Sequence, residues 1–369
     1  FSISQKIKKR ISVVTPKVII YLGQSVEAYG SMFGTLMSGG FYSPIHIGGS
    51  GYLKRKILQS FEPHIIITSS ALTDEIESLI VKSNISCRLI IIDQLLQNIL
   101  KNQIEVNIHD IDFDIVNPPY KGNYKKLAYV IFTSGTTGIP KGVMISRNAL
   151  AKYINWAISE LKPDGTDKWA QFSNISFDLS VLDIFGGLCS GATLYPVTKK
   201  ADRLLFGGFI RQNKITMVNI VPSVTDLLIH SKQLTKKNMN SVRLMNYCGE
   251  PLMEYQIEAM FKANPNLRIN NAYGPTECTV SCTVLRLTKN NYKKFCAHSV
   301  ALGNVIPGMD LILERKDDDS GEIVLGGGQV AEGYWQDQEG TNKSFFEKVI
   351  NGEFVRFYRT GDWARYGKR

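Results

Sequence analysis

The sequence lacks the patterns that mark zinc-binding, membrane-spanning and nucleic-acid-binding chains. Its six cysteines form no C-x-x-C pair and its five histidines are equally scattered, so we expect no zinc site built from them. No stretch reaches the roughly 18 consecutive apolar residues of a membrane-spanning helix. The net charge is +10, but no dense stripe of Arg and Lys with interleaved aromatic residues accompanies it, so we expect no nucleic-acid partner. Cysteine usage of this kind fits a reducing compartment and predicts a cytoplasmic protein.

The chain also lacks the biased composition of a disordered, collagen-like or coiled-coil protein. Hydrophobic residues make up 44% and charged residues 21%, which is ordinary for a globular protein. At about 150 residues per domain, its 369 residues suggest two or three structural units. The sequence begins at Phe1 without an initiator Met, so we expect it to be part of a longer chain.

Short apolar runs alternate with amphipathic segments over residues 1–299. The pattern predicts strands at residues 18–21, 64–68, 89–93, 128–133, 193–195, 216–219, 243–247 and 268–271. It predicts helices at residues 26–37, 74–83, 147–159, 179–188, 204–211 and 255–263. This alternation indicates an α/β fold with two helix-covered, mostly parallel sheets.

The pattern changes at about residue 300, where helical periodicity fades. Strands are predicted at residues 300–302, 311–313, 322–325 and 354–359, separated by Gly, Asp and Pro. Residues 102–126 and 316–320 are predicted to be polar loops. We therefore divide the chain into α/β subdomains at 1–299 and a small β-rich, barrel-like subdomain at 300–362.

The stretch at residues 129–142 carries the strongest chemical signal. An apolar strand runs into a loop of hydroxyl residues, glycines and one lysine: Thr133, Ser134, Gly135, Thr136, Thr137, Gly138 and Lys141. Glycines allow backbone N–H groups to approach a phosphate, hydroxyls donate hydrogen bonds, and lysine neutralises charge. The loop is not the Walker motif, because Lys141 is not preceded by Gly. A plain Gly/Thr-rich turn is the alternative.

The segment at residues 133–142 resembles the phosphate loop of the adenylate-forming superfamily, which includes acyl-CoA synthetases, luciferases and amino-acid adenylation domains. The stretches at residues 36–44, 177–180, 271–277, 321–334 and 358–362 resemble other elements of that family in the same order. The resemblance covers nearly the whole chain and implies the large N-terminal domain of such an enzyme. It implies that residues 363–369 begin a hinge to a mobile C-terminal domain, which carries a lysine needed for full catalysis and is absent here.

The resemblance also implies an ATP site with Mg²⁺. Tyr273 would stack on adenine against residues 249–251, Thr276 would contact the α-phosphate, Glu277 would hold Mg²⁺, and Asp362 would bind the ribose hydroxyls. Alternatively, Tyr273 belongs to the core and Asp362 caps a turn. The candidates for nucleotide contacts are Thr133, Ser134, Gly135, Thr136, Thr137, Gly138, Gly249, Glu250, Pro251, Asn271, Ala272, Tyr273, Gly274, Thr276 and Asp362. The catalytic candidates are Lys141, Thr276 and Glu277.

Asp178 is the main sequence clue to the substrate. In amino-acid-activating members of the family, the matching aspartate pairs with the α-ammonium of the substrate, and a buried carboxylate is costly unless a cation meets it. Alternatively, Asp178 is only the N-cap of the helix that begins near Leu179. The resemblance implies a substrate pocket formed by Asp178, Leu179, Leu182, Asn219, Asn246, Cys248, Ala272, Val280 and Ser281.

The stretches at residues 177–185 and 247–250 resemble those of D-alanine–carrier-protein ligases and their glycine-activating relatives, whereas Asn219 and Asn246 depart from the more apolar D-alanine pattern. We therefore expect glycine or alanine as the substrate, and a polar amino acid as the second possibility because of Asn219 and Asn246. The implied reaction converts ATP and the amino acid to aminoacyl-AMP and pyrophosphate. The aminoacyl group then passes to the phosphopantetheine thiol of an acidic carrier protein. The alternatives are a carboxylate–CoA ligase and a catalytically inactive nucleotide-binding scaffold or sensor.

Overall fold

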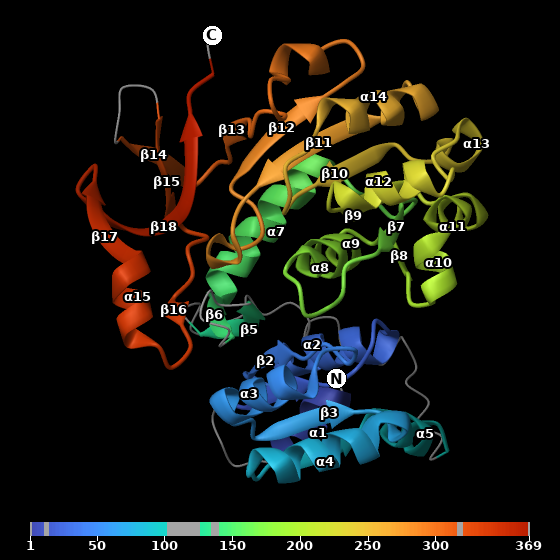
Figure 1. The fold of residues 1–369 in the computed structure, drawn as a ribbon. Helices are drawn as coiled ribbons and strands as arrows, with labels where there is room; N and C mark the ends of the chain where they lie inside the picture. The colour runs from blue at the N-terminus through green and yellow to red at the C-terminus, as the bar shows by residue number, and fades with distance from the viewer. Residues whose placement is uncertain (1, 11–14, 102–125, 134–139, 316–319, 368–369) are drawn as a thin grey trace. The chain divides into compact units, whose positions relative to one another are not determined.

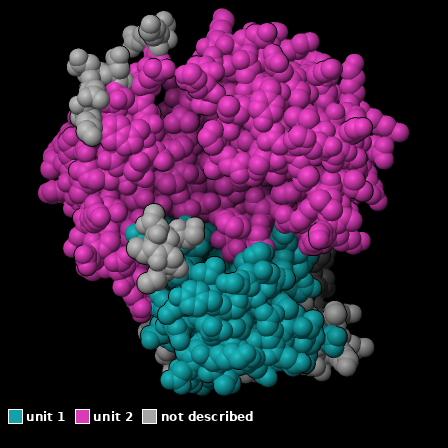
Figure 2. All heavy atoms as spheres, viewed as in Figure 1, with its two compact units in different colours: residues 1–147 teal, residues 148–369 magenta. Residues whose placement is uncertain are grey.

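The computed structural model describes residues 2–10, 15–101, 126–133, 140–315 and 320–367 (Figure 1). By internal contacts the chain forms two compact units, residues 1–147 and 148–369, which Figure 2 colours separately. No helix among the described residues is long and apolar enough to cross a membrane. Each unit is described by itself below.

The first unit is built on a mostly parallel sheet with the strand order β6-β5-β2-β1-β3-β4. Only β6 runs antiparallel, paired with β5. The strands are β1 (Lys17–Ile20), β2 (Phe41–Pro44), β3 (Ile65–Thr68), β4 (Arg88–Ile91), β5 (Leu127–Thr133) and β6 (Lys141–Ser146). The helices are α1 (Ser2–Arg10), α2 (Val26–Met37), α3 (Gly51–Phe61), η1 (Ser70–Leu72), α4 (Thr73–Ser83) and α5 (Ile92–Lys101). The four residues of β3 are all buried, as expected for an inner strand of a parallel sheet that is covered on both faces.

The second unit contains a larger sheet with the strand order β13-β12-β11-β10-β9-β7-β8. Strands β7 to β11 are parallel, and β12 and β13 close one side in antiparallel fashion. The strands are β7 (Lys168–Gln171), β8 (Thr193–Pro196), β9 (Met217–Ile220), β10 (Leu244–Tyr247), β11 (Arg268–Tyr273), β12 (Thr283–Leu287) and β13 (Asn304–Val305). The helical segments are α7 (Arg147–Leu161), α8 (Leu179–Val181), η3 (Leu182–Gly186), α9 (Gly187–Cys189), α10 (Lys200–Leu204), α11 (Phe206–Asn213), α12 (Ser223–His230), α13 (Lys236–Met239), α14 (Glu254–Ala263), η4 (Thr276–Cys278) and η5 (Tyr292–Phe295).

The two faces of this sheet differ in chemistry. Alternate residues of β9 and β10, among them Val218 and Met245, pack in an apolar core with α11, α12, α13 and α14. Because successive strand residues point to opposite faces, the residues between them, Asn219 and Asn246, face the other side. These two asparagines lie side by side in register. The polar face is the one that bears the predicted substrate residues.

The helical stretch at residues 179–189 is continuous but not uniform. Its middle segment, η3, is π-helical, and the flanking segments α8 and α9 are α-helical. Single π-helical turns occur often at functional sites, because the extra residue per turn redirects side chains. The helix predicted at residues 179–188 is confirmed, and the π-helical turn is a feature that the sequence pattern did not predict.

A small antiparallel sheet follows, with the strand order β14-β15-β18-β17. Its strands are β14 (Met309–Arg315), β15 (Ser320–Gly327), β17 (Phe345–Ile350) and β18 (Glu353–Arg365), with β16 (Gly333–Tyr334) and α15 (Gln338–Ser344) between them. The predicted strands at 311–313, 322–325 and 354–359 are confirmed. The division of the chain after residue 299 stays a prediction.

The strand predicted at residues 300–302 is wrong. Val300 makes only an isolated bridge to Cys296, and its amide donates to the carbonyl of Leu252. The carbonyl of Ala301 accepts a hydrogen bond from the side chain of Asn271 at 2.9 Å. Side-chain and isolated backbone bonds thus satisfy this apolar segment without a strand ladder. The predicted polar loops at 102–126 and 316–320 fall almost entirely outside the described residues.

Candidate functional site

The predicted substrate and adenine residues of the second unit gather at the carboxyl ends of its parallel strands. Residues 249–251 follow β10, and residues 274–277 follow the end of β11. Asn219 and Asn246 lie inside β9 and β10, close to those ends. The carboxyl edge of a parallel sheet is where α/β proteins usually bind ligands, because the loops that leave the strands converge there. The topology therefore brings together residues that are far apart in the sequence, such as Asn219 and Glu277.

Asp178 stands at the beginning of α8 and has no cationic partner among the described residues. Its backbone is helical and its side chain makes no capping hydrogen bond, so the interpretation as a simple N-cap is not supported. Exclusion of water raises the pKa of Asp178 to about 6, the side chain of Thr276 lowers it, and the negative charge of Glu277 raises it. A carboxylate in this position is stabilised by an incoming cation.

An apolar cluster begins at Leu179, next to the half-buried Asp178. Leu179, Cys248 and Ala272 form one buried cluster, against which Val221 packs. Burial raises the pKa of the Cys248 thiol well above its ordinary value, so at neutral pH the group is an uncharged wall residue and not a nucleophile. Leu182 is buried as well.

Tyr153 of α7 also lies in this region, although no sequence motif pointed to it. The hydroxyl of Ser281 donates a hydrogen bond to the Tyr153 hydroxyl at 3.4 Å. Burial raises the pKa of Tyr153 well above its ordinary value, the hydrogen bond from Ser281 lowers it, and the negative charge of Asp178 raises it further. This large ring is the aromatic side chain that the list of predicted pocket residues lacked.

A polar chain runs along the polar face of the sheet beside this cluster. Asn246 donates from Nδ2 to Oδ1 of Asn219 at 2.8 Å. Asn219 in turn donates from Nδ2 to the carbonyl of Leu179 at 3.0 Å and to Oδ1 of Asp183 at 3.1 Å. Trp169 donates from Nε1 to the same oxygen of Asp183 at 3.0 Å. Asp183, Tyr153 and Trp169 are the members of this region that sequence reasoning missed.

The loop after β11 is held in an unusual backbone conformation. Thr279 and Val280 have φ angles of 58° and 71°, a region that β-branched residues rarely adopt. A hydrogen bond from the Thr279 hydroxyl to the carbonyl of Gln329, at 2.6 Å, helps to hold it. Cys248 Sγ approaches the carbonyl of Val280 at 3.5 Å. Strain of this kind persists only where the surroundings impose it, and it is frequent at binding sites.

Two glycines of the predicted adenine site are required by the backbone. Gly249 has a φ of 99°, which favours glycine. Gly274 packs so closely on the returning chain that a Cβ would lie 2.5 Å from the Cα of Ser281. Both glycines allow a backbone path that a larger residue would obstruct.

The remaining predicted adenine and ribose residues have partners within the second unit. Tyr273 donates from its hydroxyl to Oδ2 of Asp362 at 2.7 Å, which joins β11 to β18. The side chain of Glu250 is exposed and accepts from the Ser223 amide at 2.8 Å, at the first residue of α12. Pro251 is exposed. The Asn271 side chain holds the segment at residues 300–301, so its amide serves the framework.

Glu277 lies beside two tyrosines of the strand-rich part. Tyr334 donates from its hydroxyl to Oε1 of Glu277 at 2.8 Å, and the hydroxyls of Tyr334 and Tyr358 are 3.3 Å apart. Burial and the negative charge of Glu277 raise the pKa of Tyr334 to about 12, so the phenol stays a donor at neutral pH. A carboxylate held in this way suits Mg²⁺, which is typically bound by one or two carboxylates together with substrate phosphates. No group of three or more acidic, His or Cys side chains that could hold a metal occurs in the described part of the chain.

Thr133 and Lys141 belong to the first unit. Thr133 ends β5 and Lys141 begins β6, and the Thr133 hydroxyl donates to the Lys141 carbonyl at 3.5 Å. The predicted phosphate-loop residues Ser134, Gly135, Thr136, Thr137 and Gly138 lie outside the described residues. Their role in phosphate binding stays a prediction.

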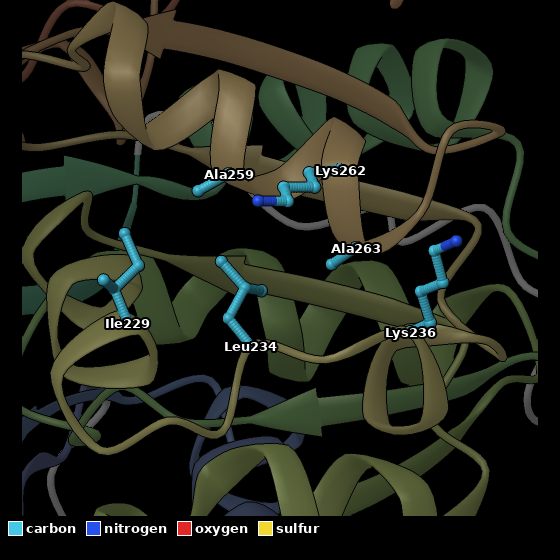
Figure 3. Close-up of a pocket in the computed structure, with 6 residues that line it drawn as sticks. All are labelled: Ile229, Leu234, Lys236, Ala259, Lys262 and Ala263. Carbon is cyan, nitrogen blue, oxygen red and sulfur yellow. The ribbon is translucent and has the colours of Figure 1, made fainter.

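A separate hollow of about 320 Å³ lies between α12, α13 and α14 (Figure 3). Its lining contains none of the predicted site residues and consists of Ile229, Leu234, Lys236, Ala259, Lys262 and Ala263.

Comparison with known proteins identifies the family. Residues 13–335 match the family model described as AMP-binding enzyme. The chain belongs to the AMP-binding enzyme family. The resemblance inferred from the ordered motifs is thereby confirmed, and so is the α/β fold class.

Relatives of this AMP-binding chain include D-alanine–D-alanyl carrier protein ligases and tyrocidine synthase 1. The D-alanine–D-alanyl carrier protein ligase of Listeria monocytogenes serovar 1/2a is 29% identical over 366 residues, which cover 96% of this chain and 68% of the relative. The ligase from a serotype 4b strain is 30% identical and is covered to 65%. Tyrocidine synthase 1 of Brevibacillus parabrevis is 28% identical, with 94% of this chain and 30% of the synthase covered. The chain thus spans about two thirds of the length of the ligases.

Solved structures of adenylation domains share the fold of this AMP-binding chain. The Vibrio cholerae adenylation domain AlmE, solved with glycyl-adenosine-5'-phosphate, has a TM-score of 0.82 and 26% identity, with 98% of this chain and 70% of AlmE covered. The N-terminal subdomain of Klebsiella oxytoca NpsA has a TM-score of 0.78 at 18% identity, which shows a common fold; 99% of this chain and 87% of that subdomain are covered.

Proposed function

We propose that this chain is the ATP- and amino-acid-binding part of an amino-acid adenylating ligase that forms an aminoacyl-AMP. The observation that carries the proposal is Asp178, a half-buried carboxylate beside the apolar cluster of Leu179, Cys248 and Ala272 with no cationic partner among the described residues. An α-ammonium group supplies the missing positive charge. Neither a carboxylate–CoA ligase nor an inactive nucleotide-binding scaffold has an evident use for such a carboxylate.

In the proposed reaction, a carboxylate oxygen of the amino acid attacks the α-phosphorus of ATP. The bond from that phosphorus to the oxygen shared with the β-phosphate breaks, and its electron pair leaves with pyrophosphate. Asp178 holds the ammonium group so that the substrate carboxylate is presented in one orientation. Lys141, the loop at residues 133–138 and Thr276 stabilise charge on the phosphates, while Tyr273 and Asp362 position adenine and ribose.

Mg²⁺ fits this proposal through the carboxylate of Glu277. The metal, when bound, supplies positive charge that offsets the phosphate charge. Tyr334 holds one oxygen of Glu277 by a hydrogen bond and fixes the orientation of the carboxylate.

We further propose that the substrate is glycine or alanine. The buried cluster of Leu179, Cys248 and Ala272, together with the hydrogen-bonded pair of Tyr153 and Ser281, supports a small side chain. The names of the related ligases refer to D-alanine, and the AlmE structure contains a glycyl adenylate. A polar amino acid is the second candidate, because Asn246 also lies on this face of the sheet.

The second half of the proposed activity is transfer to the phosphopantetheine thiol of a carrier protein in the cytoplasm. The support is the carrier named in the related ligases and the net charge of +10, which suits an acidic partner. We place the ATP- and amino-acid-binding subdomains at residues 1–299 and the β-rich subdomain at 300–362. The hinge to a mobile C-terminal domain stays a prediction for residues 363–369, of which Trp363–Arg365 belong to β18.

Amino-acid-dependent ATP–pyrophosphate exchange on the full-length parent protein tests the proposal. Glycine, both enantiomers of alanine, the other common amino acids and simple carboxylic acids are compared. We expect strong exchange with one small amino acid, reduced about 100-fold or more by Asp178→Ala, because the ammonium loses its charged partner.

The matched control is Asp310→Ala, which removes an exposed aspartate of β14 and should leave exchange unchanged. Exchange that depends on simple carboxylic acids and is insensitive to Asp178→Ala would instead support a carboxylate–CoA ligase. No exchange with any amino acid or carboxylic acid would favour a catalytically inactive nucleotide-binding sensor.

A further inference from the structure

A second carboxyl group lies one helical turn beyond Asp178 and is fully buried. Asp183 lies in the π-helical segment η3, and its exposure is 0%. Its Oδ1 accepts hydrogen bonds from Trp169 Nε1 at 3.0 Å and from Asn219 Nδ2 at 3.1 Å. Its Oδ2 has no hydrogen-bond partner among the described residues. No sequence motif assigned Asp183 a role.

The surroundings of Asp183 favour the neutral carboxyl group. Its two partners, an indole N–H and an amide N–H, carry no charge. An ionised carboxylate without a cationic partner is much more costly to bury than a neutral carboxyl. Burial raises the pKa of Asp183 well above its ordinary value, although the bonds from Asn219 and Trp169 act in the opposite direction. Asp183 is therefore not a second site for the substrate ammonium.

The hydrogen bonds of Asn219 are all used within the protein. Its two amide protons go to the Leu179 carbonyl and to Asp183, and its oxygen accepts from Asn246. A rotated amide would place its oxygen against the Leu179 carbonyl, which cannot donate. The orientation of Asn219 is thus fixed by its neighbours, and Asn219 has no amide proton left for a substrate.

The same bonds set the orientation of Asn246. Its Nδ2 must point toward the oxygen of Asn219, which leaves the Asn246 oxygen and one amide proton for other groups. Asn219 is fully buried, whereas Asn246 retains 6% exposure and lies two residues before Cys248 of the pocket wall. Asn246 is therefore the asparagine that can meet a bound amino acid.

We propose that Asp183 is a positioning residue that locks the amide of Asn219 and, through it, presents Asn246 to the substrate in one orientation. This inference rests on the proposed function, and it identifies a determinant of amino-acid specificity at the same site. Asp183 acts through two other residues and touches neither ATP nor the amino acid. Its loss should alter the recognition of the amino acid and leave the recognition of ATP intact.

The test compares Asp183→Ala, Asp183→Asn and Asn219→Leu in the full-length protein by exchange kinetics over a panel of amino acids. For Asp183→Ala we expect the KM of the preferred amino acid to rise about tenfold or more, because the Asn219 amide loses a buried partner. The KM of ATP should stay the same, and the preference among amino acids should broaden. Asp183→Asn keeps an acceptor oxygen for Trp169 and Asn219 and should restore the KM to within about threefold of wild type.

A double-mutant cycle distinguishes positioning from a general loss of structure. If Asp183 acts through Asn219, Asp183→Ala combined with Asn219→Leu should raise the KM no further than either substitution alone. The matched control is Asp167→Ala, which removes a buried aspartate from the amino edge of the same sheet. It should lower the melting temperature without changing the KM of the amino acid.

A readout that needs no turnover separates the two proposals. Binding of non-hydrolysable aminoacyl sulfamoyl adenosines is measured by thermal shift for every variant. A wild-type protein that binds none of them overturns the proposed function and this inference together. If the wild type binds, two results overturn only the inference about Asp183. One is that Asp183→Ala has the same affinity and preference as wild type; the other is that Asp183→Asn fails to restore them. If Asp183→Ala does not fold, Asp183→Asn and Asn219→Leu still test the inference about Asp183. Wild-type affinity in Asn219→Leu would overturn that inference.

Discussion

Asp178 combines a raised pKa with a position where the proposed substrate requires a negative charge. Its pKa of about 6 results chiefly from exclusion of water, together with the charge of Glu277, in the absence of a bound cation. Binding of an α-ammonium group favours the ionised form of the carboxyl. Amino-acid binding should therefore remove a proton from Asp178 whenever the pH lies below this pKa.

The first prediction follows from this linkage. Between about pH 5 and pH 7 the substrate ammonium stays protonated, so Asp178 dominates the pH dependence. The dissociation constant of the amino acid should be flat above about pH 7 and rise roughly tenfold per unit below pH 6. Calorimetry in two buffers with different ionisation enthalpies measures both the affinity and the released proton. Asp178→Asn should bind the amino acid weakly at every pH and release no proton. A dissociation constant of wild type that does not change between pH 5 and pH 7 would contradict the prediction.

Sequence reasoning reached only some residues of this region. Asp178, Tyr273, Glu277 and Asp362 lie in recognisable motifs, and their roles in binding stay predictions. Tyr153 lies in the middle of an ordinary amphipathic helix, where its position looks like that of any core aromatic residue. Its proximity to Ser281 depends on tertiary packing between positions that are 128 residues apart, and no local pattern encodes it.

At the scale of elements, the loop between β11 and β12 is built around a close backbone approach. Gly274 faces backbone atoms of the returning chain, and a Cβ would lie 2.8 Å from the amide nitrogen of Cys282. Backbone atoms cannot yield as the end of a flexible side chain does. The conformation of this loop sets the positions of both Thr276 and Ser281.

The second prediction concerns Gly274→Ala. The added methyl group must displace the loop that carries Ser281 and Cys282. We expect exchange to fall about 100-fold, because misplaced binding groups reduce the rate steeply. Exchange assays measure the loss of activity, and thermal melts measure any loss of stability. Gly165→Ala is the control, since its Cβ would find no neighbour closer than 3.8 Å. Wild-type exchange by Gly274→Ala would show that the close approach is not required.

Elements with a clear period were predicted well, and irregular ones were not. The helices at residues 26–37 and 74–83 are confirmed to within one residue at each end. The segment at 300–302 is apolar like a strand, but tertiary hydrogen bonds satisfy its backbone instead. The π-helical turn at Leu182–Gly186 was not predicted, because one extra residue in a helical turn leaves no distinct hydrophobic pattern.

At the scale of the whole molecule, the fold class follows from alternating strands and helices, but the strand order does not. The order β8-β7-β9-β10-β11 places β7 beside β9, so crossover connections decide which residues become neighbours. As a result the two edges of the sheet in the second unit differ: one bears residues predicted to bind substrate, and the other bears residues that stabilise the fold. The carboxyl edge bears the predicted site, and the amino edge bears the ion pair of Asp167 and Arg243.

The third prediction tests whether the stability of the amino edge can be changed without changing substrate binding at the carboxyl edge. Asp167 accepts from Arg243 Nε at 2.8 Å and from the Thr216 hydroxyl at 2.7 Å. Burial alone would raise the pKa of Asp167, but the bonds from Arg243 and Thr216 outweigh it and lower the pKa. A carboxyl with a lowered pKa in the folded state stabilises the fold above its unfolded pKa, and this contribution is lost as the pH falls through the folded value.

Asp167→Asn should therefore reduce the free energy of unfolding near neutral pH by about 1–2 kcal/mol, a figure lowered because Arg243 is partly exposed and screened by water. The difference from wild type should shrink below about pH 4, because the carboxyl takes up a proton first in the unfolded state and only at lower pH in the folded state. Urea unfolding across this pH range measures the difference in the free energy of unfolding. Glu314→Gln is the control, because both members of the ion pair of Glu314 and Arg359 are exposed. The KM of the amino acid should not change, since the substituted side chain lies at the edge away from the site. A raised KM in Asp167→Asn would mean that the amino edge also shapes the pocket, and the prediction would then be wrong.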